Sequence, residues 1–251
     1  MPYGIYMSAE GAQAQAQRME IISNNLANAE TVGFKRQLAI FQARFAEATQ
    51  RGQDYPGSGS INDVGGGVEV RETRTDFRQG ALRQTNRESD VAIDGDGFFE
   101  IQNGNQRLLT KAGNFTLDQN SRLVTQTGRP VLSADGAPIV LPGQGPWHIN
   151  TDGSVVQQEN IVATLSVVAP ESTNRLIHAG ENMFSLPQGG TATTVANPQV
   201  LSGYVEQSTV DPMTEMMQLI EATRAFEANT KLIQHQDSAV GNLLGRVLRA
   251  G

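Results

Sequence analysis

Apolar side chains recur every three or four positions at both ends of the chain. This spacing puts them on one helix face, and at two residues per heptad the seam is only wide enough for another helix. The N-terminal seam consists of Ile5, Ala9, Ala12, Ala16, Met19, Ser23 and Leu26. The C-terminal seam consists of Met213, Met216, Ile220, Thr223, Phe226, Thr230, Ile233, Asp237, Val240, Leu244 and Val247. The apolar members of both seams, from Ile5 to Leu244, are therefore our candidates for contacts between subunits of an assembly.

Local signals also favour helices at the two ends. A stretch rich in alanine and glutamine, 12–17, belongs to a first helix that we expect from about residue 3 to residue 28. Asp211 as N-cap, followed by Pro212, marks the start of a second helix. If that helix continued to residue 249, it would be about 57 Å long, more than a β domain of this size can cover. Much of its seam must then meet another molecule.

The segment that follows the first helix has a weaker pattern. Leu38, Phe41 and Phe45 fit one helix face, so we expect a short helix over 37–50. The glycine-rich stretch 51–67 then predicts a linker or an extended loop.

The middle of the chain changes to short apolar and β-branched segments, which are separated by turn dipeptides such as Asp135-Gly136 and Asp152-Gly153. The predicted strands are 68–70, 91–93, 98–101, 107–111, 123–125, 138–141, 147–149, 154–157 and 161–168. Their spacing of about 8 to 12 residues indicates an antiparallel sandwich or a small barrel.

These patterns together predict an α+β fold. Long N- and C-terminal helices form a coiled-coil-like helical domain, and the centre is an all-β domain of short antiparallel strands. The helical assembly domain is discontinuous and takes residues 1–30 and 205–251. Residues 31–80 form a linker or extended connection, and residues 81–204 form the β domain.

Composition narrows the classes of partner. The net charge of the 27.0 kDa chain is -7, and no segment concentrates lysine or arginine, so nucleic acid is not an expected partner. The longest apolar run, 161–169, is far short of the roughly 20 residues that a membrane-spanning helix needs, so we expect no membrane insertion. The first basic residue is Arg18, which leaves no charged segment typical of a cleavable signal peptide. The absence of cysteine excludes disulfides and thiolate metal sites.

The chain carries no pattern that indicates catalysis, a cofactor or a metal. The three histidines, His148, His178 and His235, are scattered, and there is no nucleophile elbow or phosphate-binding loop. Asp94-Gly95-Asp96-Gly97 looks like a calcium loop, but Ala92 and Asn103 would then stand where ligands are needed. We therefore expect no catalytic, cofactor-binding or metal site.

Three segments resemble signatures of the flagellar rod and hook proteins. The first comprises Asn24, Asn25, Leu26 and Asn28, with Thr31, Gly33 and Phe34 following. The second is Asp90-Val91-Ala92-Ile93 with Gly97-Phe98-Phe99. The third is Gly203-Tyr204-Val205-Glu206, followed by Arg224, Glu227 and Asn229. Their order and spacing match the family, and together they span the chain.

The resemblance implies a structural subunit of the bacterial basal-body rod, not an enzyme. Such subunits leave the cell through the flagellar export apparatus, without a cleavable signal peptide. In the periplasm they polymerise with copies of themselves and with other rod proteins, as a hollow helical tube that transmits torque and passes export substrates. The short loop before Gly65 and the opening Gly4-Ile5-Tyr6 favour the proximal type of rod protein. The distal rod type and the hook type remain alternatives.

The family signature also gives expectations for local structure. Asn24, Asn25 and Asn28 should fix the end of the first helix, and Gly33 should adopt a left-handed turn conformation.

Two hypotheses from other functional classes, a carbohydrate-binding module and a hydrolase, remain open. A periplasmic carbohydrate-binding β module would need exposed aromatic residues, although Trp147 is the single tryptophan and aromatic residues are 6% of the chain. A hydrolase could use Asp94 and Asp96 as an acid pair, but no base or oxyanion donor is evident.

Overall fold

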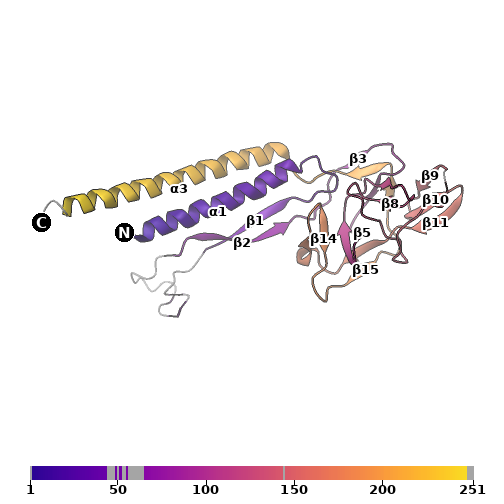
Figure 1. Cartoon of the computed structure of the whole chain (residues 1–251), viewed down its shortest axis with the longest axis horizontal. Helices are drawn as coiled ribbons and strands as arrows, with labels where there is room; N and C mark the ends of the chain where they lie inside the picture. Colours follow the sequence, from indigo (N-terminus) through magenta and orange to yellow (C-terminus); the bar gives the residue numbers. More distant parts are fainter. Residues whose placement is uncertain are drawn as a thin grey trace. The chain divides into compact units, whose positions relative to one another are not determined.

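The computed structural model describes residues 2–43, 49, 51–52, 55, 65–143 and 145–247 of the 251-residue chain. Contacts divide the chain into two compact units (Figure 1). The terminal unit comprises Met1–Ala27, Gln37–Arg74 and Asp211–Gly251. The β unit comprises Asn28–Arg36 and Thr75–Val210. Each unit is therefore assembled from segments that are distant in the sequence.

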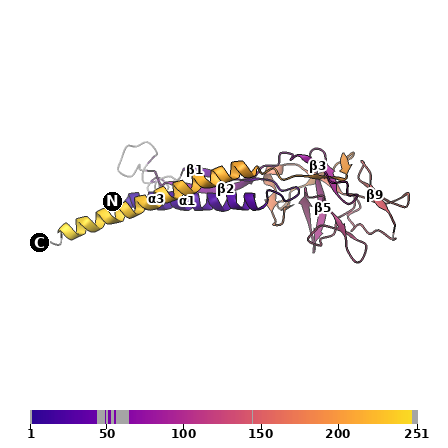
Figure 2. The ribbon, with the colours of Figure 1, turned by 90° about the horizontal axis from the view of Figure 1, so that it is seen from above.

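In the terminal unit, helices α1 (Pro2–Ala27) and α3 (Pro212–Val247) lie side by side and antiparallel (Figures 1 and 2). The first residues of α1 lie near the far end of α3, and Asn25 at the other end of α1 contacts Glu215 in the first turn of α3. Both helices were predicted close to these bounds, because propensity and capping are local signals.

Asp211 caps α3 as expected. Its carboxylate accepts hydrogen bonds from the Met213 amide (3.2 Å) and the Thr214 hydroxyl (2.5 Å). The Thr214 hydroxyl bond is the main cause that lowers the pKa of Asp211 below its ordinary value. The cap therefore stabilises the helix above the ordinary aspartate pKa, and this stabilisation is lost as the pH falls through the lowered pKa.

The segment after α1 is a strand and not the predicted helix. β1 (Gln37–Ala43) pairs with β2 (Val68–Thr75) in a two-stranded sheet, and β1 also contacts α1. Leu38 and Phe41 fit a helical period, but pairing with a strand about 30 residues away overrides that local pattern. The rest of the predicted helix, apart from Thr49, lies outside the described residues.

The predicted fold class is wrong in its helical part. Helix α1 is short, with 26 residues, and the terminal unit holds a β-hairpin beside α1 and α3 instead of being a coiled-coil-like helical domain. Within this chain the predicted seam of α1 is only partly buried, because Ala12 is buried whereas Ala9, Ala16 and Ser23 are exposed. The residues that α1 buries are Ser8, Ala12, Ala14, Ile22 and Asn25. This face is broader than a two-residue seam because α1 contacts both α3 and β1.

The β unit fits the predicted central β domain. Its strands are β3 (Leu82–Gln84), β4 (Val91–Ile93), β5 (Phe98–Asn103), β6 (Gln106–Thr110), β7 (Thr116–Leu117), β8 (Leu123–Val124), β9 (Trp147–Ile149), β10 (Ser154–Gln157), β11 (Asn160–Thr164), β12 (Val167–Pro170), β13 (Ile177–His178), β14 (Met183–Ser185), β15 (Ala192–Thr194), β16 (Val200–Ser202) and β17 (Tyr204–Glu206). The largest sheet has the order β13-β14-β6-β5-β12-β15, and β11-β10-β9 form a second sheet. Three further pairs, β16-β4, β17-β3 and β7-β8, complete the unit, and the pairings are antiparallel as expected.

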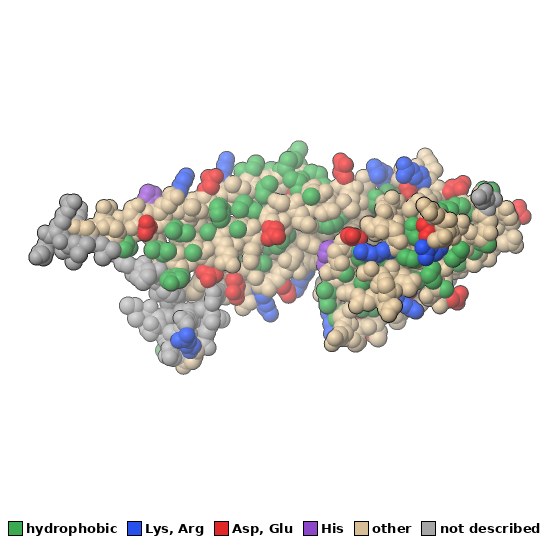
Figure 3. Space-filling view, viewed as in Figure 1, with side chains coloured by type: hydrophobic (Ala, Val, Ile, Leu, Met, Phe, Trp, Pro, Cys, Tyr) green, Lys and Arg blue, Asp and Glu red, His purple; other side chains and the backbone are tan. Residues whose placement is uncertain are grey.

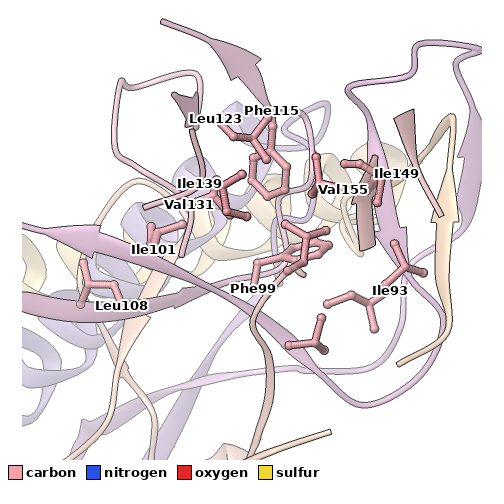
Figure 4. Packing of buried hydrophobic residues seen from close by; sticks show 14 of the residues in the cluster. Ile93, Phe99, Ile101, Leu108, Phe115, Leu123, Val131, Ile139, Ile149 and Val155 are labelled. Atoms are coloured by element: carbon pink, nitrogen blue, oxygen red, sulfur yellow. The ribbon is translucent and has the colours of Figure 1, made fainter. Parts of the chain in front are cut away.

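Two apolar clusters cover the two faces of the large sheet. Phe99 and Leu108 belong to the larger cluster (Figure 4), whereas the adjacent Phe98 and Leu109 belong to the smaller one. Side chains on a strand alternate between faces, so β5 and β6 are buried on both sides. Ring contacts reinforce each cluster, with Phe99 against Phe115 at 5.2 Å and Phe98 against Phe77 at 5.7 Å between centroids.

Several strands of the β unit differ from the predicted ones. The predicted strand 161–168 is two strands, β11 and β12, because the chain crosses from the second sheet to the large sheet near Leu165. Residues 138–141 form isolated bridges through Pro138 and Val140 and no continuous strand. The short strands β3, β7 and β13 to β17 were not predicted, since two or three residues carry too little pattern.

We predict that Gly113→Ala destabilises the β unit by more than about 3 kcal/mol, because the new Cβ would lie 1.7 Å from the backbone oxygen of Val91. Gly128→Ala is the matched control. Gly128 has a positive φ of 80°, but a Cβ added to it would have no neighbouring atom within 4 Å in the described part of the chain, so only about 1–2 kcal/mol of backbone strain is expected. Urea unfolding of both variants measures the difference, and equal midpoints would contradict the packing described here.

Candidate assembly interface

Glycines on α1 allow α3 to approach closely. A Cβ added to Gly4 would lie 2.9 Å from the Gln236 side chain, and one added to Gly11 would lie 3.1 Å from that of Asn229. The Asn229 side chain also donates a hydrogen bond to the carbonyl of Ala225, one turn earlier in α3 (3.0 Å). The family-signature residue Asn229 therefore lies inside the helix pair, and Gly11 leaves room for it.

Asn25 joins three segments of the terminal unit. Its side-chain amide donates to the carbonyl of Gln37 (2.8 Å) and to the carboxylate of Glu215 (3.3 Å), and its carbonyl accepts from the Gln37 amide (2.9 Å). Asn25 is 1% exposed and Glu215 is 0% exposed. Only a side chain that both donates and accepts can make this set, which explains an asparagine at this position. The end of α1, the start of β1 and the first turn of α3 are thereby fixed together.

The first three turns of α3 expose large apolar side chains. We define Met213, Met216, Met217 and Ile220 as the methionine patch; they are 68%, 46%, 61% and 54% exposed. Hydrophobic side chains gather along this part of the terminal unit in the space-filling view (Figure 3). An exposed cluster of this kind indicates a surface that another molecule covers.

The structure divides the predicted interface residues into two groups. Buried or half-buried in the terminal unit are Ile5, Ala12, Met19, Leu26, Phe226, Ile233 and Val240. Exposed are Ala9, Ala16, Met213, Met216 and Ile220. The side chain of Leu244 lies outside the described part. Sequence periodicity selected three of the four patch residues but missed Met217, because a two-residue seam admits only one of two adjacent positions.

The β unit contains a buried ion pair that the sequence did not single out as a site. Lys35 Nζ lies 2.5 Å from Glu206 Oε1, and the two side chains are 0% and 1% exposed. Lys35 also donates to the carbonyl of Arg78 (2.6 Å), and the Gly80 amide donates to Glu206 (2.8 Å). We call this pair with its two backbone partners the clasp. It joins the segment that enters the β unit after α1 to the segment that leaves the unit before α3.

Gly33 lies beside the clasp with the expected left-handed conformation, φ 67°. Its amide donates to the carbonyl of Glu206 (2.7 Å), and a Cβ would lie 2.6 Å from backbone atoms of Lys111 and Ala112. The turn before it is closed by Asn28, whose side chain accepts a hydrogen bond from the hydroxyl of Thr31 (3.1 Å).

A second cation approaches the clasp. Lys111 is 4% exposed, donates to the carbonyl of Gly95 (2.8 Å) and lies over the ring of Phe98. Burial lowers the pKa of Lys111, while the charge of Glu206 partly opposes that shift. Among the described residues Glu206 Oε2 has no hydrogen-bond partner although it is buried, so the two lysines balance a carboxylate that neutral donors only partly satisfy.

A polar cleft of about 450 Å³ lies between α1 and the hairpin, lined by Gln17, Glu20, Ile21, Asn24, Gln37, Val70, Arg71, Glu72 and Thr73. Across the residues that the structure places, no three His, Cys, Asp or Glu side chains come together as metal ligands. None of the helices in those ranges combines the length and hydropathy that crossing a bilayer requires.

We predict that Asn25→Asp destabilises the terminal unit by about 2–4 kcal/mol, because the carboxylate cannot donate to Gln37 and meets the buried Glu215. Gln13→Glu makes the same chemical change at an exposed position of α1 and should stay within about 0.5 kcal/mol of the parent chain. Thermal unfolding followed by far-ultraviolet circular dichroism compares them. Similar losses in both variants would count against the role of Asn25.

Loss of the clasp should be larger than loss of a surface pair. Lys35→Met leaves the Glu206 carboxylate buried without its cation and should destabilise the β unit by about 3–5 kcal/mol. Arg74→Met removes an exposed pair with Glu72 (3.3 Å) and should change stability by less than about 1 kcal/mol. Chemical denaturation at neutral pH measures both, and a Lys35→Met loss as small as the Arg74→Met loss would refute the structural importance of the clasp.

Comparison with known proteins covers all three signature segments. Three family models match: "Flagella basal body rod protein" at residues 5–35, "Flagellar hook protein FlgE/F/G D1 domain" at 92–176 and "Flagellar basal body rod FlgEFG protein C-terminal" at 201–245. The rod protein FlgF of Caulobacter vibrioides is 31% identical over 237 residues, covering 94% of each chain. The rod protein FlgG of Bacillus subtilis is 31% identical over 257 residues, covering 96% of this chain and 97% of its own. A second FlgG, from Buchnera aphidicola, is 32% identical over 260 residues, covering 95% and 97%. The chain belongs to the flagellar basal-body rod protein family.

Proposed function

We propose that this chain is a structural subunit of the bacterial flagellar rod and polymerises through the outer faces of its terminal unit. The observation that carries the proposal is the methionine patch, which the family-matched C-terminal region exposes on α3. Burial of one such side chain contributes about 1.5–3 kcal/mol, so covering the patch can drive association. In the assembled rod the subunits form a hollow tube that transmits torque and passes export substrates.

The β unit has the properties that a load-bearing element needs. Its large sheet is packed on both faces, and the clasp fixes the segments through which the chain enters and leaves. Dense packing resists deformation, so a load applied to the unit is transmitted with little internal rearrangement. This design suits a drive shaft, whose subunits hold their shape under torque.

We infer the proximal rod type, FlgF, from the lengths of the alignments. The alignments with FlgF proteins have 237, 241 and 242 positions and cover 94–96% of this 251-residue chain, or about 236–241 residues, so they open almost no gaps in this chain. The alignment with Buchnera FlgG has 260 positions for 95% of the chain, or about 238 residues, so that FlgG carries about 22 additional residues. The distal rod type is thus the second candidate within the family, and its identities of 31–32% are no lower.

The two hypotheses from other functional classes, a carbohydrate-binding module and a hydrolase, have less support. Trp147, the single tryptophan, packs against the larger apolar cluster and so is poorly placed to stack on a sugar. Asp94 accepts a hydrogen bond from the Gln79 side chain (3.3 Å) in an exposed turn, which lacks the enclosed setting that an acid pair of a hydrolase uses. The relatives are rod proteins by name and not enzymes.

We place the working protein in the periplasmic part of the basal body, among copies of itself and other rod proteins. We propose that the subunits reach the rod through the flagellar export apparatus, as membership of the rod family implies. The patch would expose apolar surface in any free subunit, so early assembly in the cytosol must be avoided. Export of the unfolded chain, followed by folding against neighbours at the rod tip, meets this need.

Introducing charge into the patch tests the proposal. Met216→Glu with Ile220→Glu should reduce incorporation into basal bodies at least about tenfold, because two carboxylates would be desolvated without partners. The isolated variant should unfold at the parent's temperature, since both positions are exposed. Gln234→Glu, which is also exposed on α3, is the control and should assemble normally. Immunoblots of isolated basal bodies and swimming assays give the result, and normal incorporation of the double variant would refute the proposed interface.

A further inference from the structure

Helix α3 continues past the point where α1 begins. Gly4 lies level with Gln236 and Gly11 with Asn229, so residue numbers on facing positions add to 240. Pro2, the first residue of α1, is then level with about residue 238 of α3. The last turns of α3 extend beyond the start of α1 (Figures 1 and 2). We define residues 239–245 as the overhang.

The overhang presents an apolar and closely approachable surface. Leu243 is 47% exposed, and in the described part of the chain no atom lies within 4 Å of a Cβ built on Gly241 or Gly245. Glycines four residues apart on a helix lie on one face and allow another helix to come close. Each of them weakens the helix by about 1 kcal/mol relative to alanine, which a close contact would offset.

The methionine patch matches the overhang in length and character. The patch spans residues 213–220, about 12 Å of helix, and the overhang spans about 10 Å. The patch side chains are uncharged, and so is every residue of the overhang, Ala239-Val240-Gly241-Asn242-Leu243-Leu244-Gly245. Methionine is flexible enough to fit around a glycine-bearing helix.

Within one subunit the two surfaces cannot meet. Met217 and Leu243 are 26 residues apart on one continuous helix, which is about 39 Å. Each subunit therefore offers one patch and one overhang at opposite ends of α3. A contact between unlike surfaces repeats from copy to copy and builds an open array, whereas two patches in contact would close into a dimer and leave both overhangs bare.

We propose that the methionine patch of one subunit receives the α3 overhang of a second copy of this chain. This inference rests on the proposed rod function and names the partner of the patch. The contact joins the start of one α3 to the end of the next, so it sets the direction in which subunits add.

Paired cysteines test the contact, because the chain contains no cysteine of its own. Met217→Cys with Leu243→Cys, oxidised in isolated basal bodies, should give a ladder of covalent dimers and larger multimers. Each single variant should stay monomeric. A disulfide within one chain is excluded, since its Cα atoms must be about 4.4–6.8 Å apart. Met217→Cys with Gln234→Cys is the control pair and should give at least about tenfold less product.

The outcomes distinguish failure of the proposed contact from failure of the proposed rod function. A doubly substituted protein that enters basal bodies but gives no ladder overturns the contact and leaves the rod function standing. Dimers from Met217→Cys alone indicate a two-fold contact and also overturn it. Absence of the unsubstituted protein from basal bodies overturns the rod function itself.

A charge pair provides a second test if the cysteine variants assemble poorly. Met217→Glu and Leu243→Lys should each reduce incorporation about tenfold, and together they should restore most of the loss, because opposite charges would then face each other between copies. A combined variant no better than either single one would overturn the proposal.

Discussion

Buried polar contacts fix the chain on both sides of segment 28–36, one set of contacts within each unit. On one side, Asn25 binds the backbone of Gln37 and the carboxylate of Glu215. On the other, Lys35 pairs with Glu206 in the clasp. Each unit is built from segments that are distant in the sequence. These contacts hold the segments of each unit against one another. A buried polar group that loses its partner destabilises the fold by several kcal/mol. The contacts in each set therefore depend strongly on one another.

The same arrangement leaves apolar surface uncovered. Asn25 and the glycines of α1 commit one face of α3 to the helix pair, while the methionine patch faces away and stays exposed. A monomeric protein rarely keeps such a surface, but a subunit of an assembly needs it. The firm β unit and the incomplete terminal unit thus have different tasks. We propose that the first keeps its shape and that the second provides the contacts that build the rod.

The sequence predicted what local signals determine and missed what distant contacts determine. The bounds of α1 and α3 followed from helix propensity and from the Asp211-Pro212 start, and Gly33 followed from turn chemistry. The sequence predicts a helix for the segment at Leu38 and Phe41, because the pairing of this segment with β2 gives no local sequence signal. The ion pair of Lys35 and Glu206 joins positions 171 residues apart, so no local pattern indicates it. The seam on α1 coincides only partly with the face that α1 buries, since no periodicity shows that a strand also packs there.

Electron microscopy of isolated basal bodies, at a resolution that shows side chains, tests the central claim most directly. The account predicts a neighbouring subunit packed over Met213, Met216, Met217 and Ile220 in the assembled rod. An assembled rod in which water still surrounds these four side chains would contradict it.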